Sequence, residues 1–168
     1  MRLVIRSAIA AGPEVEVTPE TPDHEALMRQ ALVLARLAAA AGETPVGAIV
    51  VKGGTIIGTG AERTRTRLDV TAHAEVEALR AASQHLQSSR LAGCTLYTTV
   101  EPCVLCGYAI RRAAVARVVY GVATRHAGAV TSAYRILADT SLQGWPAVPD
   151  VIAGVLEADC EDMVNGRT

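Results

Sequence analysis

Two short segments, Thr71-Ala72-His73-Ala74-Glu75 and Glu101-Pro102-Cys103-Val104-Leu105-Cys106, contain the residues that decide the fold of this 168-residue chain. Each segment follows an irregular or strand-like stretch and stands at the start of an expected helix. On a helix, Cys103 and Cys106 are three residues apart, so both thiols leave from one face. A helix N-terminus also favours the thiolate, which is the form of cysteine that binds metal.

His73 would add a third ligand to these thiols, and three ligands leave the fourth position of a tetrahedral zinc ion open, as a catalytic site requires. Glu75 follows two residues later, where a carboxylate could take up a proton from water and pass it to a substrate. Taken singly, Cys-x-x-Cys is also typical of a redox pair or of half a structural zinc knuckle, and His-x-Glu of a solvated helix face. A structural site needs a fourth protein ligand, and the sequence has no second Cys-x-x-Cys and no His-x-x-His. The two segments together therefore favour a catalytic zinc site.

The rest of the chain alternates between helical and strand patterns around these motifs. Apolar residues at helical spacing precede Gly42, and Gly53-Gly54 is a hairpin signal between two apolar, β-branched runs. A hairpin followed by alternating helices and strands predicts an α/β sandwich with a mixed central sheet. The patterns predict helices at 21–42, 71–86, 103–114 and 157–164, and strands at 46–51, 55–59, 94–100, 115–122 and 151–156.

Length and composition predict one folded domain. The chain length fits a single domain of roughly 100–200 residues. With 50% hydrophobic and 20% charged residues the chain is too apolar to be disordered. No uncharged apolar run approaches the ~18 residues of a membrane span. Residues 1–20 are expected to form a disordered or loosely docked N-terminal arm, with an edge strand over 3–9 as the alternative, and residues 21–168 the folded domain.

Residues from about Pro22 to the C-terminus resemble the cytidine deaminase-like zinc superfamily, especially its branch of tRNA adenosine deaminases and guanine or cytosine deaminases. The spacing His-x-Glu followed by Pro-Cys-x-x-Cys is the signature of zinc deaminases. The resemblance implies a three-layer α/β/α fold with a mixed five-stranded sheet, a zinc-dependent deaminase domain at 21–168, and usually a homodimer. Besides the two motifs, the stretches that carry it are Pro45-Val46-Gly47-Ala48, Thr95-Leu96-Tyr97 and Arg117-Val118-Val119-Tyr120-Gly121.

The resemblance also implies roles for individual residues. It implies that Zn²⁺ is bound by His73, Cys103 and Cys106, and that Glu75 is the catalytic proton shuttle. In the implied reaction, activated water attacks a ring carbon that bears an exocyclic amine, Glu75 protonates the neighbouring ring nitrogen and then the amine, and ammonia departs. The positions implied to bind substrate are Thr44, Pro45, Ala48, Glu62, Ala74 and Trp145.

One of these positions departs from the family. Relatives place an asparagine in the loop after the second strand, where its amide recognises the bound base or its sugar; counting back from His73, this chain has Glu62 there. An ionised carboxylate only accepts hydrogen bonds, whereas asparagine both donates and accepts. In the pocket, Glu62 would therefore favour N–H donors on the substrate. A shift of one or two residues in this loop would instead leave it on the surface.

Two further features have two interpretations each. Arg63, Arg65 and Arg67 could contact a phosphate or an RNA backbone, or could form a solvated loop. Trp145, the one tryptophan, lies in a region that often closes over the base in related small-molecule deaminases. It is therefore a candidate lid or stacking residue, as is Tyr134, and the alternative for Trp145 is packing in the core or in a dimer interface.

The net charge of −1 and the single lysine, Lys52, argue against a protein that binds nucleic acid through a broad cationic field. The first hypothesis is therefore hydrolytic deamination of a small aminated nucleobase, nucleoside or related heterocycle, with a guanine-like base favoured and no nucleic-acid or membrane partner expected. The alternative is a tRNA-specific adenosine deaminase that edits adenosine to inosine. A third hypothesis is a catalytically inactive, zinc-stabilised binding protein, against which the intact Glu75 counts. Thiolate ligands without a secretion signal predict a cytoplasmic location.

Overall fold

The computed structural model describes residues 22–124 and 126–166. The expected N-terminal arm at 1–20, with its possible edge strand over 3–9, lies outside the described residues. Within them, no helix is long and apolar enough to cross a membrane.

A five-stranded mixed sheet forms the middle of the domain, with the strand order β2-β1-β3-β4-β5. β1 (Gly47–Lys52) runs antiparallel to both β2 (Thr55–Ala61) and β3 (Thr95–Val100). β4 (Arg117–Val122) and β5 (Asp150–Ile152) then continue the sheet in parallel. The expected mixed five-stranded sheet is thus confirmed, including the hairpin at Gly53-Gly54, where both glycines have positive φ (55° and 80°).

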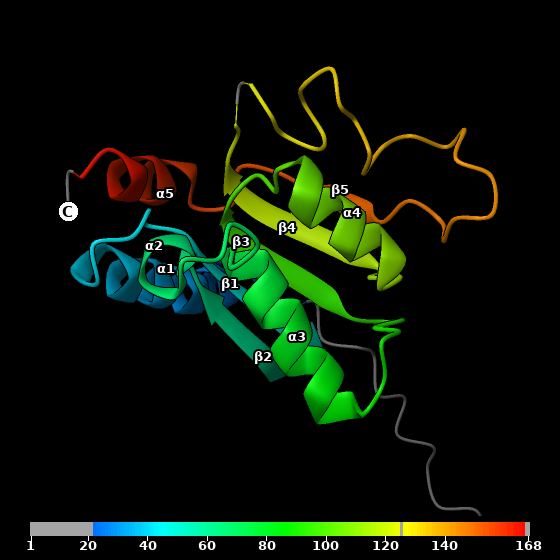
Figure 1. Ribbon diagram of the computed structural model, residues 1–168, viewed down its shortest axis with the longest axis horizontal. Coiled ribbons are helices and arrows are strands. Elements are labelled where there is room, and N and C mark those ends of the chain that lie inside the picture. Colours follow the sequence, from blue (N-terminus) through cyan, green and yellow to red (C-terminus); the bar gives the residue numbers. More distant parts are fainter. Residues whose placement is uncertain (1–21, 125, 167–168) are drawn as a thin grey trace, which may run out of the picture.

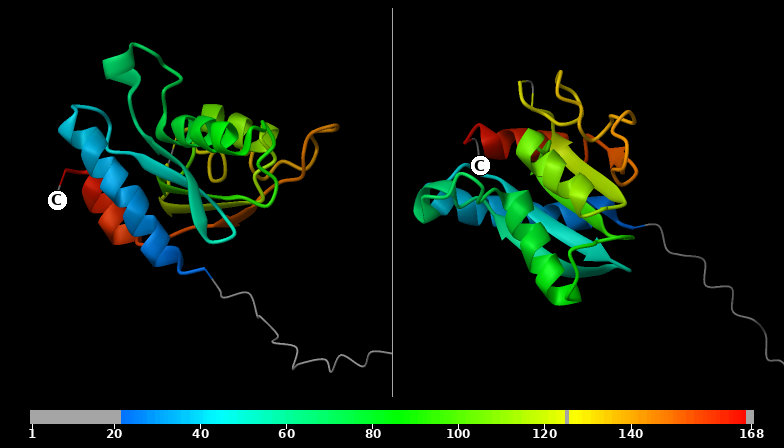
Figure 2. Two further views of the ribbon diagram at one scale, coloured as in Figure 1. Left: turned by 90° about the horizontal axis from the view of Figure 1, so that it is seen from below. Right: turned by 45° about the vertical axis from the view of Figure 1, so that its right-hand side comes forward.

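Helices cover both faces of this sheet, which makes the three layers that were expected (Figures 1 and 2). α3 (Ala74–Leu86) and α4 (Val104–Arg112) pack on one face around a core of alanine, valine and leucine side chains. α1 (His24–Ala40) and α5 (Glu157–Val164) pack on the other. The short helix α2 (Thr64–Arg67) interrupts the loop that was expected after the second strand.

α2 forms because a residue distant in sequence caps it. The Glu43 carboxylate, just after α1, accepts hydrogen bonds from the backbone N–H groups of Arg65 (3.1 Å) and Thr66 (2.7 Å). These groups lie in the first turn of α2 and have no acceptor within the helix. Local sequence shows only a polar, arginine-rich stretch, so the helix was not predicted.

The start of α3 differs from the prediction by about three residues. Asp69 Oδ1 accepts hydrogen bonds from the Thr71 N–H (2.8 Å) and the Thr71 hydroxyl (2.7 Å), which uses that side chain in the turn before the helix. His73 is therefore the residue that caps α3, with extended backbone (φ −72°, ψ 151°). This shift places the His73 imidazole at the N-terminal end of α3.

A glycine on β2 brings this helix end onto the sheet. A Cβ atom on Gly60 would collide with the Ala74 carbonyl oxygen and lie 2.6 Å from the Ala78 nitrogen. The close approach of β2 to α3 requires a residue without a side chain at this point. His73 and Glu75 are thereby held close to the sheet.

Candidate active site

The three expected metal ligands converge where α3 and α4 begin. His73 caps α3 and Cys103 caps α4, while Cys106 lies in the first turn of α4. Cys103 Sγ is 3.7 Å from His73 Nδ1 and 3.7 Å from Cys106 Sγ. All three ligand atoms lie within 4.8 Å of one another.

These separations fit a zinc ion. Tetrahedral zinc with Zn–S bonds of about 2.3 Å and Zn–N bonds of about 2.0–2.1 Å keeps its ligand atoms roughly 3.5–3.8 Å apart. The two distances from Cys103 Sγ match that spacing, and the three residues supply the nitrogen and sulfur ligands that zinc prefers. Three protein ligands are typical of a catalytic site, because one position is left for water or substrate.

Hydrogen bonds among the three ligands shift their pKa values in different directions. The hydrogen bond between the two thiols lowers the pKa of Cys103 to about 4 and raises the pKa of Cys106. The hydrogen bond with Cys103 raises the pKa of His73 to about 9. Because metal binding needs neutral imidazole and ionised thiols, zinc binding here must release protons.

Glu75 lies directly beside this cluster. Its side chain is 3% exposed. Oε2 lies 3.4 Å from Cys106 Sγ, and Oε1 lies 3.2 Å from the Thr98 hydroxyl oxygen. Burial raises the pKa of Glu75 to about 7. A carboxylate with such a pKa can both accept and donate a proton near neutral pH, as a general acid–base group must.

Sequence reasoning missed Thr98, the residue on β3 that contacts Glu75. Thr98 and Thr99 are both fully buried in this central strand. Thr98 contacts Glu75, while Thr99 Oγ1 accepts a hydrogen bond from the Gly47 N–H on the strand beside it (3.2 Å). Two adjacent buried threonines in a central strand would have been the signal, because buried hydroxyls need partners.

Glu62 and Ala74, two of the expected substrate-binding residues, contact each other next to His73. Glu62 Oε2 accepts a hydrogen bond from the Ala74 N–H (3.2 Å), the first N–H of α3. The Glu62 side chain is 7% exposed, so the alternative of a surface position is wrong. Burial raises the pKa of Glu62, and the positive charge of His73 opposes that rise.

Replacing Glu62 with alanine is expected to lower the free energy of unfolding by about 1–2 kcal/mol, because the Ala74 N–H loses its acceptor. Glu62→Gln keeps an oxygen at the same place and removes a buried charge, so it should stay within about 0.5 kcal/mol of the wild type. Urea unfolding followed by circular dichroism measures both variants. Equal stability of Glu62→Ala and Glu62→Gln would contradict the role of Glu62 as a cap.

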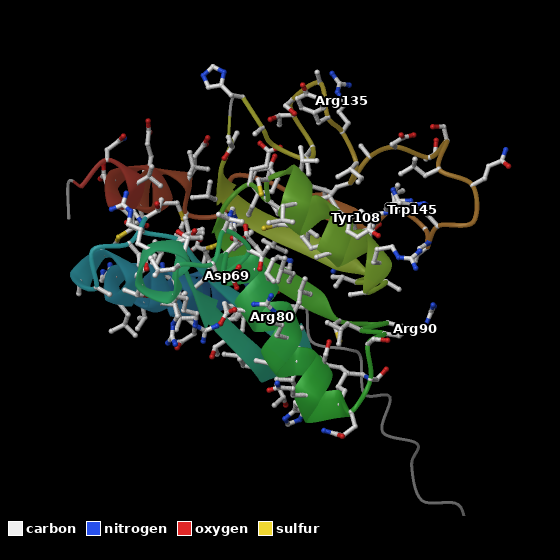
Figure 3. All side chains as sticks on the ribbon, viewed as in Figure 1. Asp69, Arg80, Arg90, Tyr108, Arg135 and Trp145 are labelled. Carbon is white, nitrogen blue, oxygen red and sulfur yellow. The ribbon has the colours of Figure 1, made fainter. Side chains whose placement is uncertain are left out.

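The other expected substrate-binding residues are distributed differently. Thr44 is exposed and Pro45 half-buried just before β1, and Ala48 is fully buried within that strand. Trp145 packs at the opposite end of α4 from Cys103, where its ring is 5.2 Å from the ring of Tyr108 (Figure 3). The structure therefore brings Glu62 and Ala74 to the ligand cluster and does not bring Trp145 there.

The layered fold and the His/Cys/Cys cluster at two helix starts together define a protein of the cytidine deaminase-like superfamily. A family model described as MafB19-like deaminase matches residues 22–139. The chain belongs to this family and is an enzyme, a hydrolytic deaminase.

Relatives with curated functions include deaminases and a protein with a different name. A tRNA-specific adenosine deaminase of Agrobacterium fabrum is 39% identical over 138 residues, which cover 82% of this chain and 89% of the relative. A tRNA(Ile)-lysidine synthase of Deinococcus deserti is 45% identical over 139 residues, or 82% of this chain. The chain spans only 25% of the length of that synthase.

Solved structures that resemble this chain are also deaminases. A structure from work on A-to-I editing by tRNA:A34 deaminases at the wobble position has a TM-score of 0.77 and 38% identity, and covers 82% of this chain and 98% of that chain. The guanine deaminase of Bacillus subtilis has 41% identity and a TM-score of 0.58, but covers only 60% of this chain and 65% of that chain.

The expectation that nucleic acid is not a partner is wrong. Relatives from Agrobacterium fabrum and Haemophilus influenzae that match most of this chain are named as tRNA-specific adenosine deaminases. The charge argument failed because net charge is a sum over the whole chain, whereas a nucleic acid contacts one face of a protein. A net charge of −1 therefore does not exclude local contacts to RNA.

Proposed function

We propose that this protein is a zinc-dependent deaminase that converts adenosine to inosine in a tRNA. The observation that carries the proposal is the extent of the similarity to a tRNA:A34 deaminase structure, which is covered almost from end to end at 38% identity. The guanine deaminase of Bacillus subtilis is similar in identity but matches only about three fifths of the chain. The guanine deaminase of Nitrosomonas europaea covers 87% of the chain, but at only 26% identity. A tRNA substrate also agrees with the cytoplasmic location predicted from the sequence.

The residues at the two helix starts supply the chemistry. A zinc ion held by His73, Cys103 and Cys106 would act as a Lewis acid that activates water for attack on the ring carbon carrying the amine. Glu75 accepts the proton that this water loses and delivers it to the adjacent ring nitrogen. The proton of the added hydroxyl group then passes through the same carboxylate to the amine, which leaves as ammonia and leaves a carbonyl.

The burial of Glu75 suits this double transfer. The carboxyl is screened from bulk water and touches Thr98 and Cys106, so its proton exchanges with groups inside the site. Glu62 adds a second carboxylate next to His73, where it accepts a hydrogen bond from the Ala74 N–H. We assign Glu62 to the substrate pocket, where an acceptor-only carboxylate would select a donor on the nucleotide.

The test is the product formed from RNA and from free bases. Purified zinc-loaded protein is incubated with a tRNA transcript carrying adenosine at the wobble position, and inosine is measured by nuclease digestion and mass spectrometry. Ammonia release is measured in parallel from adenine, adenosine, guanine and cytosine. We expect inosine in the transcript and at least about 100-fold lower turnover of the free compounds, since remote binding energy is used in the transition state. Ammonia release from guanine without inosine in the tRNA would overturn the proposal.

A further inference from the structure

Thr98 occupies a position where packing alone does not call for a hydroxyl group. It lies on β3, the middle strand of the sheet, and its side chain is fully buried. Leu96, two residues earlier, packs in the core beside α3 and α4, and residues two apart on a strand face the same side of the sheet. Valine has nearly the same shape and would fill this space without needing a hydrogen-bond partner. The hydroxyl of Thr98 therefore points to a use beyond packing.

The partners of this hydroxyl indicate that use. Thr98 Oγ1 lies 3.2 Å from Glu75 Oε1 and 3.1 Å from the carbonyl oxygen of Val100. A hydroxyl carries one hydrogen and also accepts hydrogen bonds. It can donate to Glu75 when that group is a carboxylate, and it can accept from Glu75 and donate to Val100 when the carboxyl carries a proton. The contact is thus available before and after each proton transfer.

The Thr98 contact gains importance when the thiols bind a metal. Glu75 Oε2 lies 3.4 Å from Cys106 Sγ, where the thiol is the donor. A cysteine that binds metal has lost its hydrogen and cannot donate. Of these two contacts, the hydrogen bond from Thr98 is then the one that remains. It holds Oε1, while Oε2 is left beside the ligand cluster.

The position of the Glu75 carboxyl matters because a glutamate side chain rotates about several bonds. In the proposed reaction this carboxyl accepts a proton from water and delivers protons to the ring nitrogen and to the amine. A general acid–base group has to lie within hydrogen-bond reach of each of these atoms, about 2.6–3.2 Å between heavy atoms. A displacement of about 1 Å can cost about 100-fold in rate. A carboxyl fixed at one oxygen keeps the other oxygen within reach.

We propose that Thr98 is a positioning residue for the deamination: its hydroxyl holds Oε1 of Glu75 against β3 and keeps Oε2 beside the metal ligands, where water and the reacting base meet. The inference rests on the proposed function, in which Glu75 transfers the protons. The Thr98 hydroxyl contacts Glu75 and the backbone of its own strand. It therefore acts on the reaction through Glu75.

The end of β3 that follows Thr98 is anchored. The next residue after the strand, Glu101, is 2% exposed. Its carboxylate accepts four hydrogen bonds from the connection between β4 and β5. Oε1 accepts from the N–H groups of Val130 (2.9 Å) and Thr131 (2.7 Å), and Oε2 accepts from the Thr124 N–H (2.9 Å) and the Thr131 hydroxyl (2.7 Å). The strand is thereby held at the end nearest the metal ligands, so loss of one hydroxyl is not expected to move it.

The helix with the cysteine ligands is anchored as well. Arg111, in the last turn of α4, is 3% exposed. Its guanidinium donates to the carbonyl oxygens of Ile136 (2.8 Å), Asp139 (2.9 Å) and Pro146 (2.8 Å) in the same β4–β5 connection. A buried arginine that binds three carbonyls of one segment fixes that segment against the helix. With β3 and α4 both held, the carboxyl of Glu75 is the part that moves when the hydroxyl is lost.

The test compares Thr98→Val with Thr99→Val in the zinc-loaded protein. Thr99 is the next residue on β3 and is equally buried, but its hydroxyl accepts from the Gly47 N–H instead of contacting Glu75. Inosine formation at increasing tRNA concentration gives kcat and KM. We expect Thr98→Val to lower kcat by about 10- to 150-fold, the range for a hydrogen bond to a charged group. KM should stay within about 2-fold, because no contact to substrate is removed.

Thr99→Val should behave differently, with kcat within about 2-fold of the wild type and a lower Tm, because the Gly47 N–H loses its acceptor. Thr98→Ser restores a hydroxyl and should recover most of the kcat that Thr98→Val loses. In a Glu75→Gln background, Thr98→Val should change the residual rate by less than about 2-fold, because the two residues act as one unit. Equal kcat of Thr98→Val and Thr99→Val, or a Thr98→Ser protein as slow as Thr98→Val, would overturn the positioning role.

Crystal structures of the zinc-loaded wild type, Thr98→Val and Thr99→Val give a readout that does not depend on turnover. The Glu75 carboxyl should turn away from β3 in Thr98→Val and keep its position in Thr99→Val. A carboxyl that stays in place in Thr98→Val overturns the positioning role even if kcat falls.

These measurements separate failure of the positioning role from failure of the proposed function. Inosine formation by Thr98→Val at the rate of the wild type overturns the positioning role and leaves the editing function standing. A wild type that forms no inosine overturns the editing function. In that case the position of Glu75 in the crystal structures still decides the role of Thr98, and the same kcat comparison is made with whichever free base or nucleoside releases ammonia.

Discussion

Replacing Glu75 with glutamine is expected to lower kcat by about 10²–10⁴-fold, the usual contribution of a general acid–base group. Glutamine has nearly the same shape and can still contact Thr98, but it cannot accept a proton from water or return one to the amine. The effect should therefore appear in kcat, with RNA affinity and zinc content unchanged. Single-turnover inosine formation measures the rate, fluorescence anisotropy measures the RNA affinity, and elemental analysis measures the zinc content.

Glu77→Gln is the matched control. Glu77 is on the same helix two residues later, where it pairs with Arg67 (2.6 Å) and Arg80 (2.6 Å). The same chemical change at this position should leave kcat within about 2-fold, because Glu77 pairs with these arginines and not with the ligand cluster. Partly exposed ion pairs also contribute little to stability. A Glu75→Gln protein that works as fast as Glu77→Gln would show that another group transfers the protons.

Replacing Cys103 with alanine is expected to remove both the metal and the activity. Cys103 is the central ligand, 3.7 Å from both of the others. Loss of partners outside the ligand set already costs 10–100-fold in affinity, so loss of a ligand should weaken zinc binding by more than about 100-fold. Zinc per protein, measured after gel filtration, should fall from about one equivalent to near zero.

Cys94→Ala serves as the control for this experiment, because Cys94 is a buried thiol just before β3 and is not part of the ligand cluster. It should retain zinc and activity. Chelation of the wild type should lower Tm and abolish activity, since a metal that binds the native state stabilises it. Added zinc should restore both in the wild type and neither in Cys103→Ala. Full zinc content in Cys103→Ala would refute the ligand assignment.

The sheet, the helices and the ligand cluster could be predicted because local patterns encode them. The apolar runs and the Gly53-Gly54 turn identify the hairpin, and two motifs at helix starts place His73 and Cys103 at the ends of neighbouring helices. Such patterns predict the first residue of a helix poorly. Thr71 is a good cap by type, yet Asp69 engages it first and α3 starts at Ala74.

Interactions between distant residues could not be predicted in this way. Glu43 creates α2 from more than twenty residues away. Arg111 looks like a surface residue at the end of a helix, but it is buried because the carbonyls of a segment much later in the chain surround it. The position of Trp145 depends on that segment as well. These contacts need the tertiary structure, since no short-range periodicity marks either partner.

The way in which Glu101 and Arg111 hold the β4–β5 connection has a consequence for how the family can diversify. Both residues bind mainly main-chain groups, namely backbone N–H groups for Glu101 and carbonyl oxygens for Arg111. Side chains between these anchors, such as Tyr134 and Arg135, can be exchanged without removing an anchor. Substitutions in this stretch can therefore change the surface that the connection presents while the metal ligands and Glu75 stay in place.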